Sequence, residues 1–346
     1  MKVVTIGGGT GAYNLLPAIK NIPNIEISSI VTMSDDGGST GKLRDEFGVL
    51  PSGDIRRALV ALSDDEKSKY MREMFNYRFN KGGISGHNLG NLIMLALEDI
   101  AGDYGKSIDI LEELFEVKGK VYPVTFEKTK LLAKLEDGSF VLGESNLDFP
   151  KHNGNLKIEQ LFVLKEDYGK ILEKVLKEEI TIQPEILNNI ISNFSSDSVA
   201  ENPKLAQIIL EADFVIFGPG DLYGSIMSNL VVGNMKQLLL KSKAKKIYIN
   251  NLFTKYGETS TFKLSDFVET FEKFFGEDIF DYILVHDRSK YPIDSSVLES
   301  YKSENKKRIE NNGRDKRIIK ADFVKTSDFA RHSSDKLRVI LEKILV

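Results

Sequence analysis

The chain has 346 residues, of which 41% are hydrophobic and 28% charged, a composition that fits a folded globular protein and excludes a mainly disordered chain. Its 47 basic and 51 acidic residues give a net charge of -4, so bulk attraction to nucleic acid or an anionic membrane is not expected. The lack of cysteine excludes disulfides, thiolate catalysis and cysteine-based zinc sites, and four histidines leave little for a histidine-rich metal centre.

The sequence shows no targeting or membrane signal. A strand-like run starts at residue 2 or 3, which leaves no room for the parts of a signal peptide. The longest apolar stretches, such as 92–97, are far shorter than the ~18 residues that span a bilayer. We therefore expect a cytoplasmic protein with no membrane span.

The most informative motif is a glycine loop near the N-terminus. The apolar run 3–6 leads into Gly-Gly-Gly-Thr-Gly at 7–11 and then into a helix-like segment, 12–16. With Ala12 this fits G-x-G-x-x-G/A, in which residues without side chains let backbone N–H groups approach a phosphate. The alternative is a turn that only packs a helix closely on a strand. The candidate ligand contacts here are Gly8, Gly9, Thr10 and Gly11.

Buried-type strands alternate with helices along much of the chain. Apolar, β-branched runs predict strands at 3–6, 25–33, 214–217, 247–250 and 282–285, and helices are predicted at 55–62, 89–100 and 226–240. Because the strands are continuously apolar, they predict a mostly parallel, Rossmann-like doubly wound α/β sheet.

The middle of the chain breaks this alternation. A hairpin is predicted within 128–144, around Asp137-Gly138, and 166–205 is polar and helical in pattern. We therefore expect one domain over 1–346 with a smaller inserted subdomain at 120–205.

An acidic motif follows the second predicted strand. It reads Ser-Asp-Asp-Gly-Gly-Ser-Thr-Gly at 34–41. In dinucleotide-binding folds an acid at this point reaches the ribose hydroxyls, so Asp35 is a candidate ligand contact. Asp35 and Asp36 are also candidates for a Mg²⁺ site, although adjacent side chains on an extended backbone point in opposite directions. The alternative is an acidic loop that caps a turn.

Two further polar clusters precede or open helices. Pro-Ser-Gly-Asp-Ile-Arg-Arg at 51–57 makes Ser52 or Asp54 a candidate helix cap, and its arginines are candidates to face a phosphate or Asp35. Ser-Gly-His-Asn-Leu-Gly-Asn at 85–91 opens an apolar helix with groups that suit hydrogen bonds to a base, sugar or carboxylate. A surface salt bridge and a structural histidine are the alternatives. The candidates are Asp54, Arg56, His87, Asn88 and Asn91.

A second glycine loop resembles the first in its layout. The strand 214–217 runs into Gly-Pro-Gly-Asp-Leu-Tyr-Gly-Ser at 218–225 and then into a helix. We expect the two loops to flank one ligand at a switch point of the sheet. A polar end of the next strand adds Asn250. The candidates from this region are Gly218, Pro219, Gly220, Tyr223, Ser225 and Asn250.

Taken in order, these motifs resemble those of the YvcK-like gluconeogenesis factors, within the superfamily of the 2-phospho-L-lactate transferase CofD. They are 7–11, 34–41, 53–56, 86–92, 218–225 and Gly-Glu-Thr at 257–259. The resemblance implies a CofD-like fold and binding of a UDP-sugar such as UDP-N-acetylglucosamine or UDP-glucose, with a role in cell shape and carbon metabolism. It also implies Ser39, Thr40 and Arg331 as further ligand contacts.

The chain departs from that family pattern at three places. Asp221 and Gly224 replace hydroxyl residues of the second loop, and Phe-Thr-Lys-Tyr at 253–256 stands where Met-Thr-Gln-Pro is typical. An acid beside a phosphate loop repels an anion. These departures leave the identity of the ligand open.

Three functions follow from these motifs. The first is a nucleotide-sugar-binding regulatory protein without a catalytic nucleophile. The second is a Mg²⁺-dependent transferase of the CofD type, in which Asp35 or Asp36 holds the metal while a phospholactyl group moves from a guanylylated donor to a deazaflavin, on the route to coenzyme F420. The third, from the first loop alone, is a nicotinamide-dependent oxidoreductase. The sequence does not fix the oligomeric state, but such α/β proteins commonly form symmetric homodimers.

Overall fold

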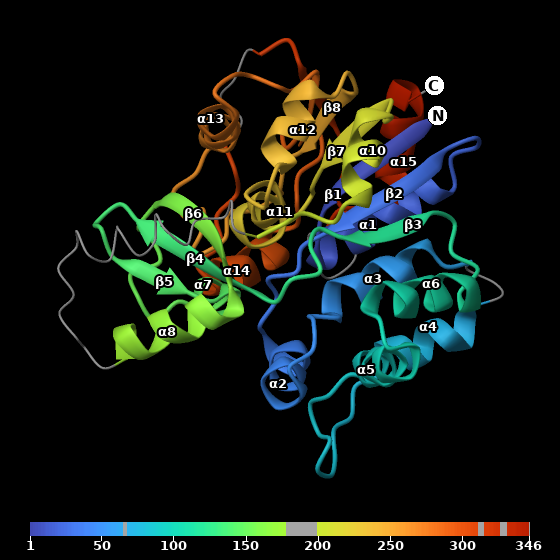
Figure 1. Cartoon of the computed structure of the whole chain (residues 1–346). Coiled ribbons are helices and arrows are strands. Elements are labelled where there is room, and N and C mark those ends of the chain that lie inside the picture. Colours follow the sequence, from blue (N-terminus) through green and yellow to red (C-terminus); the bar gives the residue numbers. More distant parts are fainter. Residues whose placement is uncertain (65–67, 178–198, 311–314, 326–330, 346) are drawn as a thin grey trace.

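The centre of the molecule is a seven-stranded parallel sheet (Figure 1). The computed structural model describes residues 1–64, 68–177, 199–310, 315–325 and 331–345, without the side chains of 175–177. The strand order is β10-β9-β8-β7-β1-β2-β3. The strands are β1 (Lys2–Gly7), β2 (Glu26–Val31), β3 (Lys120–Pro123), β7 (Phe214–Phe217), β8 (Lys245–Ile249), β9 (Tyr282–His286) and β10 (Ile318–Ala321).

The order of the strands confirms the doubly wound sheet. From β1 the chain adds β2 and β3 on one side, and from β7 it adds β8, β9 and β10 on the other, so the switch point lies between β1 and β7. Right-handed crossovers in opposite directions place their helices on opposite faces of the sheet. The five predicted strands are present, whereas β3 and β10 were not predicted.

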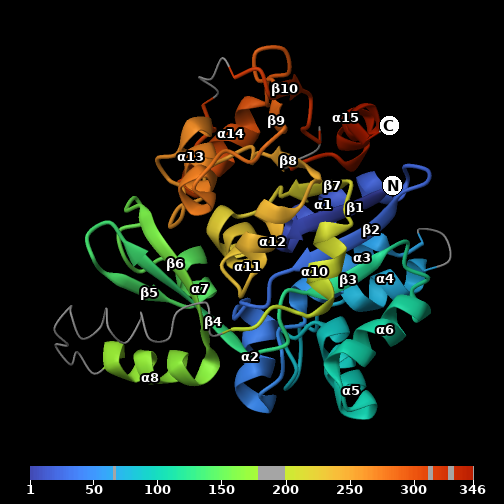
Figure 2. The same ribbon diagram turned by 45° about the horizontal axis from the view of Figure 1, so that its top comes forward.

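Helices cover both faces of the sheet (Figure 2). On one side α1 contacts α3 and α15, and on the other α10 contacts α12, while the ring of Phe271 of α13 packs edge-on against that of Phe217 of β7. The helices around the sheet are α1 (Gly9–Lys20), α2 (Gly38–Phe47), α3 (Gly53–Leu62), α4 (Lys69–Asn76), α5 (Leu89–Ala101), α6 (Tyr104–Leu114), α10 (Lys204–Leu210), α11 (Ser228–Leu230), α12 (Met235–Lys241), α13 (Leu264–Phe275), α14 (Ser295–Ser303) and α15 (Ser334–Leu345). Within the described ranges, no helix has the length and apolarity needed to cross a bilayer.

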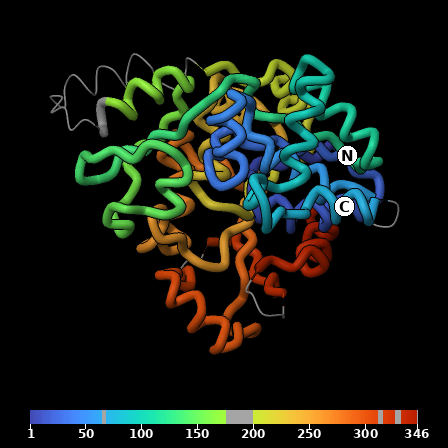
Figure 3. The backbone as a smooth tube through the Cα atoms, turned by 90° about the horizontal axis from the view of Figure 1, so that it is seen from below, coloured from blue at the N-terminus to red at the C-terminus, as the bar shows by residue number. Residues whose placement is uncertain are grey.

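A small antiparallel sheet stands to one side of the large one, as Figure 3 also shows. It consists of β4 (Thr129–Leu135), β5 (Phe140–Leu142) and β6 (Ile158–Lys165), with the helices α7 (Glu144–Asp148) and α8 (Glu166–Lys177). Pairing of β4 with β5 confirms the hairpin predicted around Asp137-Gly138. The first strand of the range 120–205, β3, pairs with β2 in the large sheet, and residues 178–198 of that range lie outside the described residues.

Two local predictions were wrong. The segment 226–240 is not one helix: a π-helical turn (Leu222–Met227) and α11 are separated from α12 at 231–234, where Gly233 has a φ of 47°. A left-handed residue interrupts the helical hydrogen-bond ladder, and glycine adopts it without strain. Ser52 precedes α3, but its side chain makes no capping hydrogen bond.

Candidate functional site

A cleft of about 760 Å³ lies at the carboxyl ends of β1 and β7. Its floor is formed by the first glycine loop, at Gly8–Gly11, and by Pro219–Asp221 of the second loop. Its far wall is formed by Asn251–Tyr256, after β8, and by Arg331 with His332. Open α/β sheets bind ligands at this edge and at the switch point of the strand order. The structure thus brings both predicted loops to one cleft.

The first loop holds open hydrogen-bond donors. Gly8 is the N-cap of α1, and Gly9, with a φ of 59°, donates its N–H to Asp54 Oδ2 at 2.9 Å. The N–H of Ala12 donates to the Gly8 carbonyl at 3.2 Å. Between Gly9 and Ala12, the N–H groups of Thr10 and Gly11 have no intrahelical partner, because they lie in the first turn of the helix. No acceptor for them occurs among the described residues either. The start of α1 therefore presents two N–H groups and the positive end of a helix dipole to the cleft.

The two loops pack backbone against backbone. A Cβ atom on Gly11 would lie 1.8 Å from the Pro219 carbonyl oxygen, so only glycine fits at this position. Gly218 donates its N–H to the Ile6 carbonyl at 3.0 Å and is joined to Pro219 by a cis peptide bond. The floor of the cleft is therefore a rigid contact between the ends of β1 and β7.

In the second loop, by contrast, the protein itself occupies the donors. Gly220 donates its N–H to Asn251 Oδ1 at 3.0 Å, and Asn251 returns a bond to the Gly220 carbonyl at 2.8 Å. The N–H groups of Tyr223 and Gly224 donate to Glu258 Oε2 at 2.9 and 3.5 Å. These three N–H groups are therefore not the open phosphate donors that the sequence predicts.

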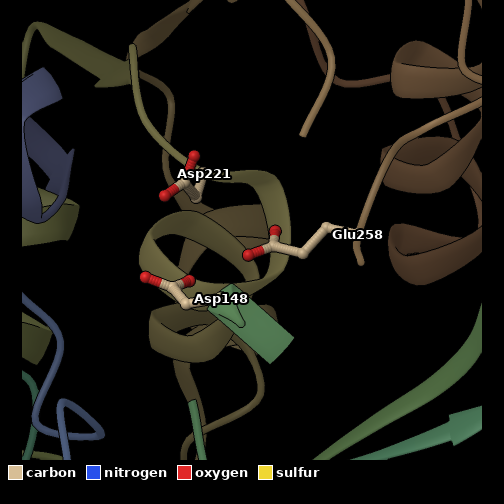
Figure 4. Close-up of side chains that lie close together, drawn as sticks. All are labelled: Asp148, Asp221 and Glu258. Carbon is tan, nitrogen blue, oxygen red and sulfur yellow. The ribbon is translucent and has the colours of Figure 1, made fainter. Parts of the chain in front are cut away.

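Beside this second loop, a lysine pairs with a cluster of three carboxylates, and Figure 4 shows those carboxylates. Ligand oxygens of Asp148, Asp221 and Glu258 lie within 4.8 Å of one another. The Lys255 ammonium lies 2.5 Å from Asp221 Oδ2 and 3.5 Å from Glu258 Oε1, and it also pairs with Asp148. Three carboxylates at such distances could hold a cation, and Lys255 supplies one from the chain itself.

Burial and charge set the protonation of this cluster. Burial alone lowers the pKa of Lys255, but the carboxylates of Asp221, Glu258 and Asp148 outweigh it and raise that pKa well above its ordinary value. Burial raises the pKa of Glu258 to about 7, against the opposing effect of Lys255. Lys255 is thus a fixed cation that offsets the negative charge of Asp221 at the edge of the cleft.

A side cavity of about 200 Å³ adjoins the cleft and shares Gly9, Thr10 and Ser225 with it. Its walls carry charged and acidic side chains, which are Asp35, Asp54, Arg57, Glu144, Asp148 and Asp221. Arg57 lies 2.7 Å from Asp54 and 4.0 Å from Asp35, as predicted for one of the two arginines.

Asp35 and Asp54 are two of the carboxylates that line the side cavity. Burial raises the pKa of Asp35 to about 6, and the nearby Asp54 adds to this effect. Asp36 turns the other way, since its Oδ1 accepts the N–H of Ser145 at the start of α7, at 2.8 Å. Asp35 lines the side cavity with Asp54, whereas Asp36 does not line it, so the predicted metal pair Asp35 and Asp36 does not share this space.

Several predicted contacts form a buried network below the cleft. Ser39 Oγ lies 3.3 Å from His87 Nδ1 and accepts the N–H of Asn88 at 3.2 Å. Asn91 donates to Ser39 and Thr40 at 3.4 Å and accepts from Arg56 Nε at 2.9 Å. Burial lowers the pKa of Arg56 to about 10. These six residues, which line neither the cleft nor the side cavity, are Ser39, Thr40, Arg56, His87, Asn88 and Asn91. The network ties α2, α3 and α5 together, and direct ligand contact for its members stays a prediction.

The other predicted residues divide between support and cleft. Tyr223 is buried and donates its hydroxyl to the Ile158 carbonyl on β6 at 3.3 Å. Asn250 is buried and receives a hydrogen bond from His332 Nε2 at its carbonyl, at 3.1 Å. That bond anchors His332, the residue after Arg331. The side chain of Arg331 itself is exposed and lines the cleft. Ser225 lines both the cleft and the side cavity.

The sequence did not single out several residues that the fold brings to the cleft. They are Asp148 and Lys255 in the cleft and Glu144 in the side cavity, whereas Asn251 and Glu258 lie in the polar motifs that the sequence indicated after β8. One signal was present: Asp221 and Lys255 both depart from the family pattern, and in the structure they form an ion pair.

The sheet and its switch-point cleft define a Rossmann-like α/β protein. Residues 3–327 match the family model described as 2-phospho-L-lactate transferase CofD. A gluconeogenesis factor of Bacillus subtilis is 32% identical over 351 residues, which cover 99% of this chain and 98% of that protein. One of Listeria innocua is 34% identical over 343 residues, which cover 97% and 93%. A crystal structure of a UPF0052 family protein from Bacillus halodurans has a TM-score of 0.82 at 31% identity and covers 98% of both chains. The chain belongs to the CofD family, in the branch of the gluconeogenesis factors.

Proposed function

We propose that this protein binds a nucleotide sugar of the UDP-N-acetylglucosamine or UDP-glucose type and acts as a regulatory protein. The observation that carries the proposal is the start of α1, where the N–H groups of Thr10 and Gly11 face the cleft at the switch point. Arg331 lines the same cleft and supplies a cation for a diphosphate. Lys255 offsets the charge of Asp221, so the second loop is less repulsive to an anion than its sequence indicates.

Calorimetry tests this proposal. The protein is titrated with UDP-N-acetylglucosamine, UDP-glucose and GDP, and we expect heat from at least one UDP-sugar. A thermal-shift screen gives an independent readout, because a ligand at 100 times its Kd adds about 2.7 kcal/mol of stability. An absence of heat from both UDP-sugars at millimolar concentration contradicts the proposal.

One observation favours a second function, a Mg²⁺-dependent transferase of the CofD type. Asp35 and Asp54 line the side cavity next to Gly9 and Thr10, where a metal would neutralise the charge of a diphosphate. The test is turnover of a guanylylated donor with a deazaflavin. In this function Asp35→Asn and Asp54→Asn abolish turnover, while Asp36→Asn, which keeps an oxygen for the Ser145 N–H, does not. A wild-type protein without turnover removes this function.

Three further features remain predictions from the sequence, and only the first of them rests on the family resemblance. They are the role in cell shape and carbon metabolism, the cytoplasmic location and the homodimer. The role in cell shape and carbon metabolism is tested in cells that lack the gene, and the homodimer is tested by light scattering.

A further inference from the structure

The carboxyl group of Glu144 lines the side cavity. Among the described residues no hydrogen bond or ion pair reaches its carboxyl group, although the group lines the cavity wall. Its Oε2 lies 4.0 Å from the Cβ position of Gly37, on the loop after β2, and its Oε1 lies 3.5 Å from that of Gly224, in the helical turn after β7. The carboxyl group therefore sits between segments that follow two different strands of the large sheet.

The element that carries Glu144 is fixed at both ends. At its start, Asp36 accepts the N–H of Ser145 at 2.8 Å. At its end, Asp148 pairs with Lys255, which is held in turn by Asp221. A side chain on an element fixed in this way keeps its position when a ligand arrives, which is a requirement for selective recognition.

We infer that Glu144 is a specificity-determining residue, which recognises an uncharged hydroxyl or amide group attached to the diphosphate. This inference rests on the proposed function, because the diphosphate at the start of α1 directs the rest of the ligand. The side cavity shares Gly9 and Thr10 with the cleft, so a group joined to a phosphate at that point faces the cavity that Glu144 lines.

The chemistry of the cavity fits a sugar better than a further phosphate. Burial and the carboxylates of Asp148 and Asp35 raise the pKa of Glu144 to about 10. An uncharged carboxyl group has one O–H donor and oxygen acceptors, so it pairs with hydroxyl and amide groups. Phosphate, by contrast, would face the carboxylates of Asp54 and Asp35 across the same small space, where Arg57 is already paired with Asp54 at 2.7 Å.

The experiment compares UDP with UDP-N-acetylglucosamine on three variants. Glu144→Ala removes the hydrogen-bonding group, and Glu144→Gln keeps one donor and one acceptor in the same shape. Glu159→Gln is the matched control, because Glu159 lies on β6 of the same small sheet with an exposed carboxylate paired to Lys134. Each variant is titrated by calorimetry with both ligands, and its fold is checked by thermal unfolding.

We expect Glu144→Ala to weaken the UDP-sugar about five- to tenfold, the usual worth of a hydrogen bond between uncharged groups, and to leave UDP unchanged. Glu144→Gln and Glu159→Gln should bind both ligands within about twofold of wild type. Equal losses for the two ligands, or no loss in Glu144→Ala, overturn the inference. The inference is also overturned if Glu144→Gln loses as much affinity for the UDP-sugar as Glu144→Ala does, because that result indicates a cation held by a negatively charged Glu144. If wild type binds UDP but the Glu144 variants do not differ from it as expected, only this inference fails and the proposed cleft stands. If wild type binds neither ligand, the proposed function itself is refuted.

Discussion

The loop after β1 and the loop after β7 both join a buried strand to a helical turn through glycines, and they form the floor of one cleft. They differ in what their N–H groups contact. In the first loop the N–H groups of Thr10 and Gly11 face the cleft, whereas in the second those of Gly220, Tyr223 and Gly224 bind Asn251 and Glu258. A glycine loop before a helix is thus a phosphate site only while its donors remain open.

The second loop serves the first as a support. Its backbone packs against Gly11, and its acid, Asp221, is tied through Lys255 to Asp148 on α7. The small sheet is thereby joined to the large one at the edge of the cleft. This division of roles predicts that changes to the ligand-facing groups of the cleft affect affinity, whereas changes where the second loop packs on Gly11 or pairs with Lys255 affect stability.

The largest effect is expected where the loops touch. Gly11→Ala places a Cβ atom 1.8 Å from the Pro219 carbonyl oxygen, and a backbone atom cannot move aside cheaply. We expect a loss of about 3 kcal/mol or more in the free energy of unfolding, measured by chemical denaturation. Gly7→Ala is the control, because a Cβ atom there meets nothing within 4 Å. Similar stabilities for the two variants would show that the loops are not in close contact.

The next effect tests the support given by Lys255. Lys255→Met leaves Asp148, Asp221 and the buried Glu258 without their cation, so we expect a loss of about 3 kcal/mol in the free energy of unfolding. Lys273→Met breaks an exposed ion pair with Glu269, and we expect it to cost less than about 1 kcal/mol. Addition of Glu258→Gln to Lys255→Met should recover part of the loss. Equal losses for the two lysine variants contradict the role of Lys255.

A pH dependence is expected from Glu258, which closes the second loop. Its pKa is about 7 in the folded protein against an ordinary value of 4.5, so its protonation stabilises the folded state. That stability is present below about pH 4.5 and is lost as the pH rises to about 7. When the pH rises from about 5 to about 7.5, the free energy of unfolding of Glu258→Gln should therefore fall by about 2 kcal/mol less than that of wild type.

The control for this titration is Glu159→Gln, which removes an exposed carboxylate from β6. It should follow the wild-type stability over the same pH range. A Glu258→Gln variant that also follows the wild-type curve would mean that Glu258 is ionised throughout, and that the second loop is closed by a permanent charge.

The sequence predicted the parts of this molecule that depend on local pattern. The buried parallel strands are continuously apolar, and the first loop has its glycines where the turn and close approach need them, so β1, β7 and both loops were found. The edge strands β3 and β10 have only four residues each and carry polar side chains, so they give no comparable signal.

The cluster around Lys255 could not be predicted in the same way. Asp148, Asp221 and Lys255 are far apart in the chain, and each reads in isolation as a surface charge. The difference between an open and a closed glycine loop was also hidden, because it depends on where Glu258 and Asn251 lie after folding. Contacts between distant segments decide these features, and the spacing of residues along one chain does not encode them.

The smallest effect concerns the open loop, where Arg331 faces the same cleft as Thr10 and Gly11. The ion pair of an exposed arginine with a diphosphate is worth about 1 kcal/mol, so Arg331→Ala should weaken UDP-sugar binding about fivefold in calorimetry without a change in stability. Salt screens exposed charges, so the difference from wild type should shrink as the salt concentration rises. Lys325→Ala removes a nearby exposed charge that does not line the cleft, and it should bind like wild type. If the two variants weaken binding equally, Arg331 acts through the overall field of the protein, and the start of α1 is then the main source of affinity for the phosphates.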